Sequence, residues 1–220
     1  MADIHFITAE VCPFAQRTHL ALVEKGLEYE HSEVDLKNKP AWFEAVSPYS
    51  KVPVLKHGDR VVYESAIINE YVEETWPEPA LMPTDPFRRA QARISIDYCN
   101  TRFIDAFYDL LSAREPAAQA ELAAKLTGCF ESMEEAGLAA LGADPYWLGS
   151  DVSLVDLAYW PFFERLPALT HYRGVGIPES CPRLKAWLAA MAERESVQRT
   201  RHEPDYYIQS YTRYTQAAAE

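Results

Sequence analysis

The chain has 220 residues, which is enough for one large domain or two small ones. Hydrophobic residues make up 48% of it and charged residues 25%, a composition that supports a packed core and differs from that of disordered chains. The formal charge of −12 argues against nucleic acid as a partner, because binding phosphates requires clustered Lys and Arg.

The sequence predicts a cytoplasmic protein that does not enter a membrane. Its first residues form neither the basic nor the apolar part of a secretory signal. No apolar stretch approaches the roughly 20 residues needed to cross a bilayer. The cysteines Cys12, Cys99, Cys129 and Cys181 are far apart in the sequence. Their spacing fits neither a disulfide framework nor a zinc site, so we expect free thiols and no metal.

Residues 1–78 predict an α/β domain. Short β-like runs alternate with helical ones, and a His-Gly-Asp turn between the last two runs is typical of a hairpin. The order is β-α-β, a crossover and then β-β-α, which is that of a thioredoxin-like domain with a four-stranded mixed sheet and three helices. The predicted strands are residues 4–8, 29–34, 52–56 and 60–63, and the predicted helices are 13–25, 40–46 and 64–76.

A proline-rich segment follows this domain. Pro77, Pro79, Pro83 and Pro86 forbid a continuous helix, and we place a linker at residues 79–86. Beyond it the pattern is helical only, so residues 87–220 predict an all-α domain. Its predicted helices are residues 87–112, 117–141, 154–165 and 184–194, with one more near the C-terminus.

Cys12 stands directly between the first predicted strand and the first predicted helix. Pro13 is pre-set for the first helical turn, so the free N–H groups and the positive end of the helix dipole point at the sulfur. This position lowers the pKa of a thiol below its free value of ~8.5 and favours the nucleophilic thiolate. An isolated cysteine is more often a packing residue, but the strand-Cys-Pro-helix context favours the nucleophile. Ala15 occupies the place of a second cysteine, so an external thiol must resolve a mixed disulfide.

Two further pairs indicate a binding site. In thioredoxin-like domains the proline at the place of Pro53 is cis, which turns the backbone of Val52 toward an extended peptide ligand. An edge strand would tolerate the same Val-Pro pair. Ser65 begins the third helix and can bind a carboxylate there, while Glu64 can receive an ammonium group. Together they would hold an α-amino acid zwitterion, although Ser65 can instead be a helix cap.

With these motifs in place, the chain resembles soluble glutathione transferases of the omega or omega-like class over essentially its whole length. In the second domain, Ser153 and Asp156 form a capping box, which is structural rather than catalytic. The likeness is carried by residues 12–18 (CPFAQRT), 36–43 (LKNKPAWF), 52–55 (VPVL), 63–67 (YESAI), 149–156 (GSDVSLVD), 160–166 (WPFFERL) and 184–191 (LKAWLAAM).

The resemblance implies roles for individual residues. Cys12 takes the place of the Tyr or Ser that activates glutathione in most other classes, and glutathione is the co-substrate. The all-α domain, residues 87–220, forms the site for the second substrate, and Trp187, with Phe14, lines its cavity. For Trp187 a place in the core is the alternative, because it shares an apolar helical stripe with Leu184 and Met191. The glutathione contacts are assigned to Phe14, Lys39, Val52, Glu64 and Ser65.

Two positions stay open at this point. Lys51 replaces the apolar residue that is usual before the Val-Pro pair, and it is either a second contact for the glycyl carboxylate of glutathione or a solvated side chain. The family implies a homodimer. Tyr49 either reaches into the partner subunit of that dimer or packs within the first domain.

Two classes of function are compatible with the fold. The first is a glutathione-dependent thiol transferase or reductase that acts on glutathionylated protein thiols, dehydroascorbate or glutathione conjugates through a mixed disulfide at Cys12. The second is a non-enzymatic relative. Stringent starvation proteins bind RNA polymerase but lack the Cys-Pro pair. Intracellular chloride channel proteins enter membranes, which the charged Lys25, Glu28, Glu30 and Glu33 make unfavourable here.

Overall fold

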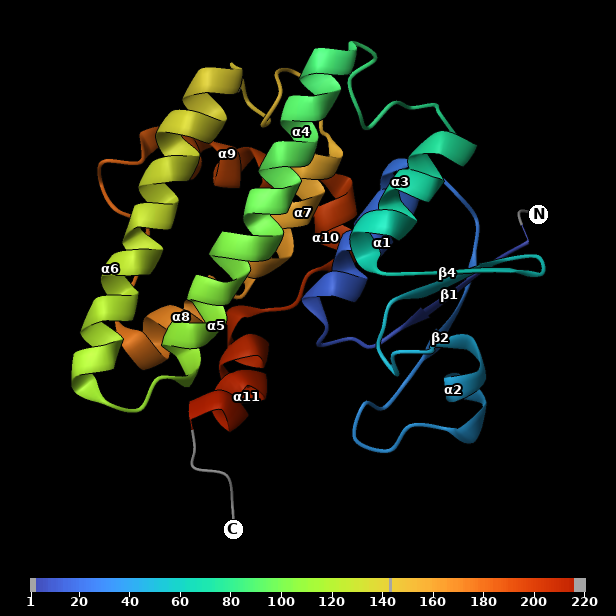
Figure 1. The fold of residues 1–220 in the computed structure, drawn as a ribbon, viewed down its shortest axis with the longest axis horizontal. Coiled ribbons are helices and arrows are strands. Elements are labelled where there is room, and N and C mark those ends of the chain that lie inside the picture. Colours follow the sequence, from blue (N-terminus) through green and yellow to red (C-terminus); the bar gives the residue numbers. More distant parts are fainter. Residues whose placement is uncertain (1–2, 143, 216–220) are drawn as a thin grey trace. The chain divides into compact units, whose positions relative to one another are not determined.

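The computed structural model describes residues 3–142 and 144–215. The chain divides into two compact units, Met1–Met82 and Pro83–Glu220 (Figure 1). The division between Met82 and Pro83 lies inside the segment 79–86, where the prolines end the α/β pattern.

The first unit contains a four-stranded mixed sheet. Its strand order is β2-β1-β3-β4, with β1 parallel to β2 and the other pairs antiparallel. The predicted sheet is therefore confirmed. Strand β3 begins after Pro53 rather than at Val52, because proline has no N–H to donate to a neighbouring strand. The strands are β1 (Ile4–Thr8), β2 (Glu30–Glu33), β3 (Val54–His57) and β4 (Arg60–Tyr63).

Three helices complete the first unit, as predicted. They are α1 (Pro13–Glu24), α2 (Ala41–Val46) and α3 (Ser65–Thr75). Helix α1 packs against α3, and α3 contacts β3 and β4. The short helix α2 is anchored by Phe43, whose side chain is fully buried in the same core as the sheet residues Phe6 and Leu55. The first unit thus has the thioredoxin-like arrangement.

A buried ion pair holds the end of the first unit in place. At the C-terminal end of α1, the Nζ of Lys25 lies 2.6 Å from Oε2 of Glu73 and donates to the carbonyl of Pro79, also at 2.6 Å. The Glu73 carboxylate also accepts from the backbone N–H groups of Leu81, at 3.0 Å, and Met82, at 3.1 Å. The two buried charges therefore have partners, as burial of ions requires.

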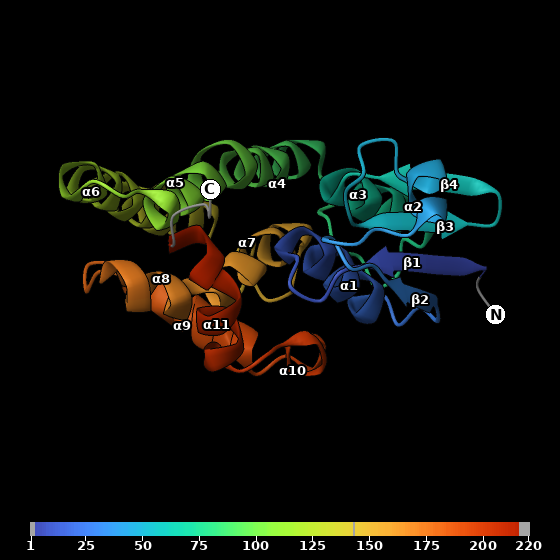
Figure 2. The ribbon, with the colours of Figure 1, turned by 90° about the horizontal axis from the view of Figure 1, so that it is seen from below.

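The second unit is helical throughout the part that the structure describes. Figure 2 shows α7 between the row formed by α4, α5 and α6 and the group formed by α8, α9 and α11. Ten of the residues of α7 are buried, which fits this central place. The helices are α4 (Pro86–Tyr98), α5 (Ile104–Ser112), α6 (Pro116–Ser132), α7 (Leu154–Glu164), α8 (Leu166–Arg173), α9 (Pro182–Ala192), α10 (Glu195–Thr200) and α11 (Pro204–Thr215).

The two long helices predicted for this unit each contain a π-helical segment. The segment η1 (Cys99–Phe103) joins α4 to α5, and η2 (Met133–Ala139) continues α6. Sequence periodicity gave no sign of either segment, since an i→i+5 turn changes the hydrophobic spacing by only one residue. The short helices α8 and α10 were also not predicted.

The capping box of α7 is confirmed, and it is part of a larger buried network. The Oδ2 atom of Asp156 accepts from the N–H of Ser153 at 2.8 Å. Its Oδ1 atom accepts from the backbone N–H of Trp147, at 2.8 Å, and from Nε1 of Trp187, at 2.7 Å. The carboxyl is fully buried, and this desolvation raises its pKa. One side chain therefore ties the start of α7 to two tryptophans.

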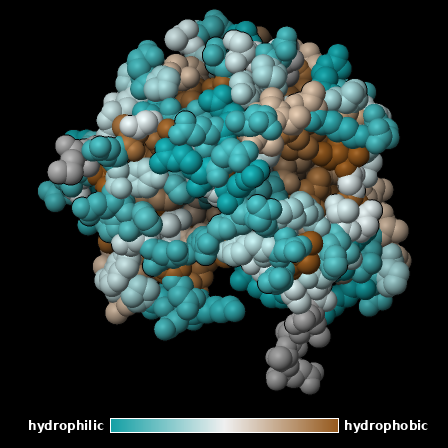
Figure 3. Space-filling view, turned by 180° about the vertical axis from the view of Figure 1, so that it is seen from behind, coloured by the Kyte–Doolittle hydropathy of each residue, from teal (hydrophilic) through white to brown (hydrophobic). Residues whose placement is uncertain are grey.

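The face of the molecule seen in Figure 3 carries many polar side chains. Hydrophilic side chains, in teal, cover much of the face seen in Figure 3, with hydrophobic patches between them. In the part of the chain that the structure describes, none of the helices has the length and apolar character required to span a bilayer.

We expect the Asp156→Ala substitution to lower the free energy of unfolding by roughly 3 kcal/mol or more, because it leaves several buried donors without an acceptor. Urea unfolding followed by circular dichroism measures the effect. The control is Asp151→Ala on the exposed loop before α7, for which we expect a change below about 0.5 kcal/mol. Equal stability of the two variants would contradict this role of Asp156.

Candidate functional site: a thiol cleft in the first unit

The register of the sheet brings three segments of the first unit to one edge. Val54 pairs with Ile7 of β1 on one side and with Tyr63 of β4 on the other. The segment that leads from β1 into α1, the segment that leads into β3 and the segment that leads from β4 into α3 therefore all lie at this same end of the sheet. They form a cleft whose lining residues all belong to the first unit: Phe14, Ser47, Tyr49, Lys51, Val52, Pro53, Tyr63, Glu64 and Ser65.

Cys12 occupies the N-cap position of α1. Its backbone is extended (φ −81°, ψ 115°), and Pro13 begins the helix, as predicted. The first turn of α1, all of which is described, carries no acidic residue to oppose the positive helix terminus. The half-buried thiol donates to the carbonyl of Val52, with 3.8 Å between sulfur and oxygen. The thiol thus lies beside the Val-Pro segment of the cleft.

The backbone around the cleft has unusual conformations. The Val52–Pro53 peptide bond is cis, as expected for a thioredoxin-like domain. Among the described residues, Ser50 (φ 53°) and Glu64 (φ 68°) are the non-glycine residues with positive φ. Both lie beside the cleft. Strained backbone of this kind gathers where a fold presents groups to a ligand.

Ser65 is not a helix cap. Helix α3 begins at Ser65, so the N-cap position belongs to Glu64, which makes no capping hydrogen bond with its side chain. The capping alternative raised by the sequence is therefore wrong. Ser65 stands instead at the first helical position, where its side chain contributes to the wall of the cleft next to the positive end of α3.

The structure separates the two lysines considered for a carboxylate contact. The ammonium of Lys39 donates to the carbonyl of Ser50, at 2.9 Å, and to its hydroxyl, at 3.1 Å. Lys39 is not among the lining residues of the cleft. Lys51 is among them, and its backbone N–H and C=O both bond the hydroxyl of Ser47, at 2.9 and 2.7 Å. Lys51 is therefore the lysine of the cleft wall.

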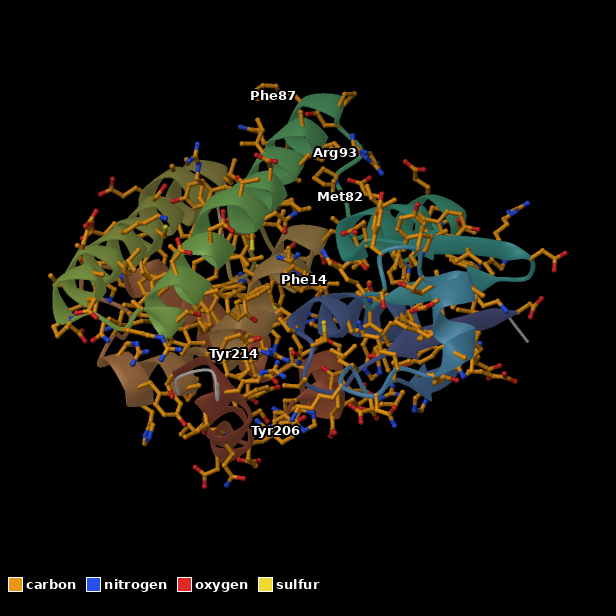
Figure 4. The ribbon with its side chains drawn as sticks, turned by 60° about the horizontal axis from the view of Figure 1, so that its bottom comes forward. Phe14, Met82, Phe87, Arg93, Tyr206 and Tyr214 are labelled. Atoms are coloured by element: carbon orange, nitrogen blue, oxygen red, sulfur yellow. The ribbon has the colours of Figure 1, made fainter. Side chains whose placement is uncertain are left out.

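Aromatic side chains complete the cleft. Phe14 lies at the N-terminal end of α1 (Figure 4), and the guanidinium of Arg17 is 5.3 Å from the centre of its ring. Tyr49 is 59% exposed and packs edge-on against Tyr63, with ring centres 5.2 Å apart. Sequence reasoning had not assigned Tyr63 or Ser47 to the site. The signal for Tyr63 was its place directly before Glu64.

The assignment of Trp187 to the second-substrate cavity is wrong. Its side chain is only 1% exposed, and its Nε1 donates to the buried carboxylate of Asp156. The indole packs against Trp147, Trp160 and Phe163, with ring centres 5.6, 6.3 and 5.3 Å away. The apolar stripe noted in the sequence indicates a core position, and the core alternative holds.

The other cysteines lie in the interior. Cys99, Cys129 and Cys181 are buried, and none of them is in a disulfide. Burial raises the pKa of the Cys129 and Cys181 thiols, which keeps them protonated. No group of three His, Cys, Asp or Glu side chains suited to a metal ion occurs among the described residues.

Comparison with known proteins identifies the family. The family model for the N-terminal domain of glutathione S-transferases matches residues 11–75, and the model for their C-terminal domain matches residues 116–190. Glutathione S-transferase omega-1 of the pig, Sus scrofa, is 33% identical over 215 residues, which cover 94% of this chain and 87% of that protein. The chain belongs to the glutathione S-transferase family.

Solved structures of glutathione transferases have the same fold. Glutathione transferase Omega 3C from Trametes versicolor superposes with a TM-score of 0.87 at 33% identity, covering 97% of this chain and 91% of that one. A rice glutathione transferase, solved in complex with glutathione, gives a TM-score of 0.88 at 28% identity and covers 96% and 95% of the two chains. The chain is thus an enzyme of this family, with the fold that the sequence predicted.

We expect iodoacetamide to label Cys12 near neutral pH much faster than the three buried cysteines of this transferase. Cys12 is half-buried at a helix N-terminus, whereas the others are buried and two of them have raised pKa values. Peptide mass spectrometry after timed quenching measures each rate. Denatured protein, in which all four thiols should react at similar rates, is the control. Comparable rates in the folded protein would contradict the site assignment.

Proposed function

We propose that this transferase is a glutathione-dependent thiol transferase or reductase that works through a mixed disulfide between Cys12 and glutathione. The observation that carries the proposal is the place of the Cys12 thiol, 3.8 Å from the carbonyl of Val52 and beside the cleft that contains Glu64 and Ser65. The position three residues after Cys12 is the buried Ala15, so the site offers no resolving thiol there. The similarity to omega-class glutathione transferases supports a reaction that uses glutathione.

Each end of glutathione has a candidate partner in the cleft. The γ-glutamyl carboxylate would accept from the Ser65 hydroxyl at the N-terminus of α3, and its ammonium group would face Glu64. The cysteinyl backbone would pair with Val52, as an added strand does. Lys51 would receive the glycyl carboxylate from the cleft wall. Two of the three N–H groups of the Lys39 ammonium bond Ser50, which leaves one N–H for the same carboxylate.

The reaction proceeds in two exchanges. The Cys12 thiolate attacks the glutathione sulfur of a mixed disulfide, the bond to the substrate sulfur breaks, and the substrate leaves as a thiolate that takes up a proton. A Cys12–glutathione disulfide remains. A second glutathione thiolate then attacks the glutathione sulfur of that disulfide, which yields oxidised glutathione and restores the Cys12 thiolate. The sum converts a glutathionylated thiol and one glutathione into a free thiol and oxidised glutathione.

This scheme also predicts weak activity in conventional conjugation. A transferase that conjugates electrophiles keeps the glutathione thiolate free and only hydrogen-bonds it. A cysteine at this place competes as a nucleophile and forms a covalent bond to glutathione instead. We therefore expect the natural substrates to be compounds that Cys12 and glutathione reduce: mixed disulfides, dehydroascorbate or glutathione conjugates.

Replacing Ser65 by Ala should weaken glutathione binding about tenfold or more, because it removes a hydrogen bond to a charged group worth roughly 1.5–3 kcal/mol. Isothermal titration with reduced glutathione measures the affinity. The control is Thr75→Ala at the other end of α3, which should bind as the parent does. Unchanged affinity in a correctly folded Ser65→Ala protein would contradict the assignment.

The Cys12→Ala substitution should abolish the glutathione-dependent reduction of hydroxyethyl disulfide without unfolding the protein. Oxidised glutathione should add one glutathione to the parent protein at Cys12, and excess reduced glutathione should remove it. In Cys12→Ser the hydroxyl can hydrogen-bond the glutathione thiolate, so weak conjugating activity should appear as thiol transfer is lost. Cys129→Ala is the control and should stay active. Full reduction by Cys12→Ala would rule out the mechanism.

A further inference from the structure

The hydroxyl of Ser47 bonds both backbone polar groups of one residue of the thiol cleft. It donates to the carbonyl of Lys51, at 2.7 Å, and accepts from the N–H of Lys51, at 2.9 Å. Ser47 is only 2% exposed, so water has little access to these bonds. A serine hydroxyl has a single hydrogen to donate, and here that hydrogen is used within the protein. Ser47 therefore lines the cleft with its hydroxyl already bonded to the chain.

Three more hydrogen bonds hold the loop 47–51, which Ser47 begins. The N–H of Ser50 donates to the carbonyl of Ser47 at 2.8 Å, which closes a turn with Pro48 at its second position, where the fixed φ of proline is favoured. The Lys39 ammonium donates to the carbonyl and the hydroxyl of Ser50. The backbone of Ser50 has a positive φ of 53°, a conformation that a residue with a side chain keeps only when its surroundings hold it there.

The beginning of this loop is attached to the core of the first unit. Helix α2 ends at Val46, and the N–H of Ser47 donates to the carbonyl of Phe43 at 2.9 Å. The side chain of Phe43 is fully buried. Through its backbone and its hydroxyl, Ser47 thus connects a core residue of α2 to Lys51 on the cleft wall.

Lys51 leads directly into Val52, whose backbone would pair with the cysteinyl part of glutathione. The carbonyl of Val52 also accepts from the thiol of Cys12, with 3.8 Å between oxygen and sulfur. Because both polar groups of the Lys51 backbone are held, the direction in which Val52 presents its own backbone is fixed before a ligand binds. A preformed site strengthens binding, since less conformational freedom is lost when the ligand arrives.

We propose that Ser47 is a positioning residue for glutathione. Its hydroxyl holds the backbone of Lys51 so that Val52 meets the cysteinyl part of the ligand and the Lys51 ammonium meets the glycyl carboxylate. The inference rests on the proposed function, because it concerns the same ligand in the same cleft. Without the hydroxyl, the backbone groups of the exposed Lys51 turn to water, and the loop must be ordered again whenever glutathione binds.

The test measures the binding of S-methylglutathione, which cannot form a disulfide with Cys12, by isothermal titration at a temperature at which each variant is folded. Ser47→Ala should bind this probe about tenfold more weakly than the parent does. For γ-glutamyl-S-methylcysteine, which lacks the glycine, the loss should shrink to about threefold, because the contact with Lys51 is absent in both proteins. Val72→Ala, a cavity in the core about two turns along α3, is the control: it should lower the melting temperature and leave the affinity unchanged.

A second variant acts on the same loop and keeps the Ser47 hydroxyl. Pro48→Gly lies at an exposed position and gives the turn more backbone freedom, so S-methylglutathione should bind about threefold more weakly, even if Ser47→Ala does not fold. Parental affinity in Ser47→Ala or in Pro48→Gly, or an equal loss in Val72→Ala, would overturn the proposal. A parent protein that does not bind S-methylglutathione would overturn the proposed function, and this inference with it.

Discussion

The site depends on one row of the sheet, in which Val54 pairs with Ile7 on one side and Tyr63 on the other. Because β3 runs antiparallel to both neighbours, the end of β1, the start of β3 and the end of β4 lie at the same edge. A thiol, a backbone carbonyl and a carboxylate from distant parts of the sequence are thereby gathered without a long loop. A slip of one residue in either pairing would turn the flanking side chains to the other face.

Much of this arrangement could be predicted from the sequence, because the signals that place it are local. Cys12 before Pro13 marks the start of one helix, and Glu64 before Ser65 marks the start of another. Each pair indicates its local backbone structure without reference to distant residues. The hydrogen bonds of Lys39 were not predictable, because its partner Ser50 lies 11 positions later in the sequence. Trp187 was misplaced although the apolar stripe of its helix indicated a core position. Its acceptor, Asp156, lies 31 positions earlier in the sequence, and no periodicity reveals such a partner.

The buried carboxylate of Asp156 and the polar groups of the cleft differ in how their hydrogen bonds are satisfied. In the second unit, Asp156 serves as a common acceptor for donors from the loop before α7 and from α9, so one desolvated carboxyl organises an aromatic core. In the first unit, the cleft leaves polar groups of Glu64 and Ser65 at the cavity wall. The Asp156 carboxylate has no remaining capacity to bind a ligand, because its oxygens already accept hydrogen bonds from the protein. The side chains of Glu64 and Ser65 at the cleft wall keep that capacity.

The ion pair between Lys25 and Glu73 bears on how the chain can be dissected. A fragment that stops at residue 78, where the α/β sequence pattern ends, would lack the Pro79 carbonyl that Lys25 binds, as well as the N–H groups of Leu81 and Met82 that Glu73 binds. The buried charges of Lys25 and Glu73 would then have only their mutual ion pair to stabilise them. A fragment that stops at residue 82 retains all these partners, so the energetic boundary of the first unit lies four residues beyond its last pattern in the sequence.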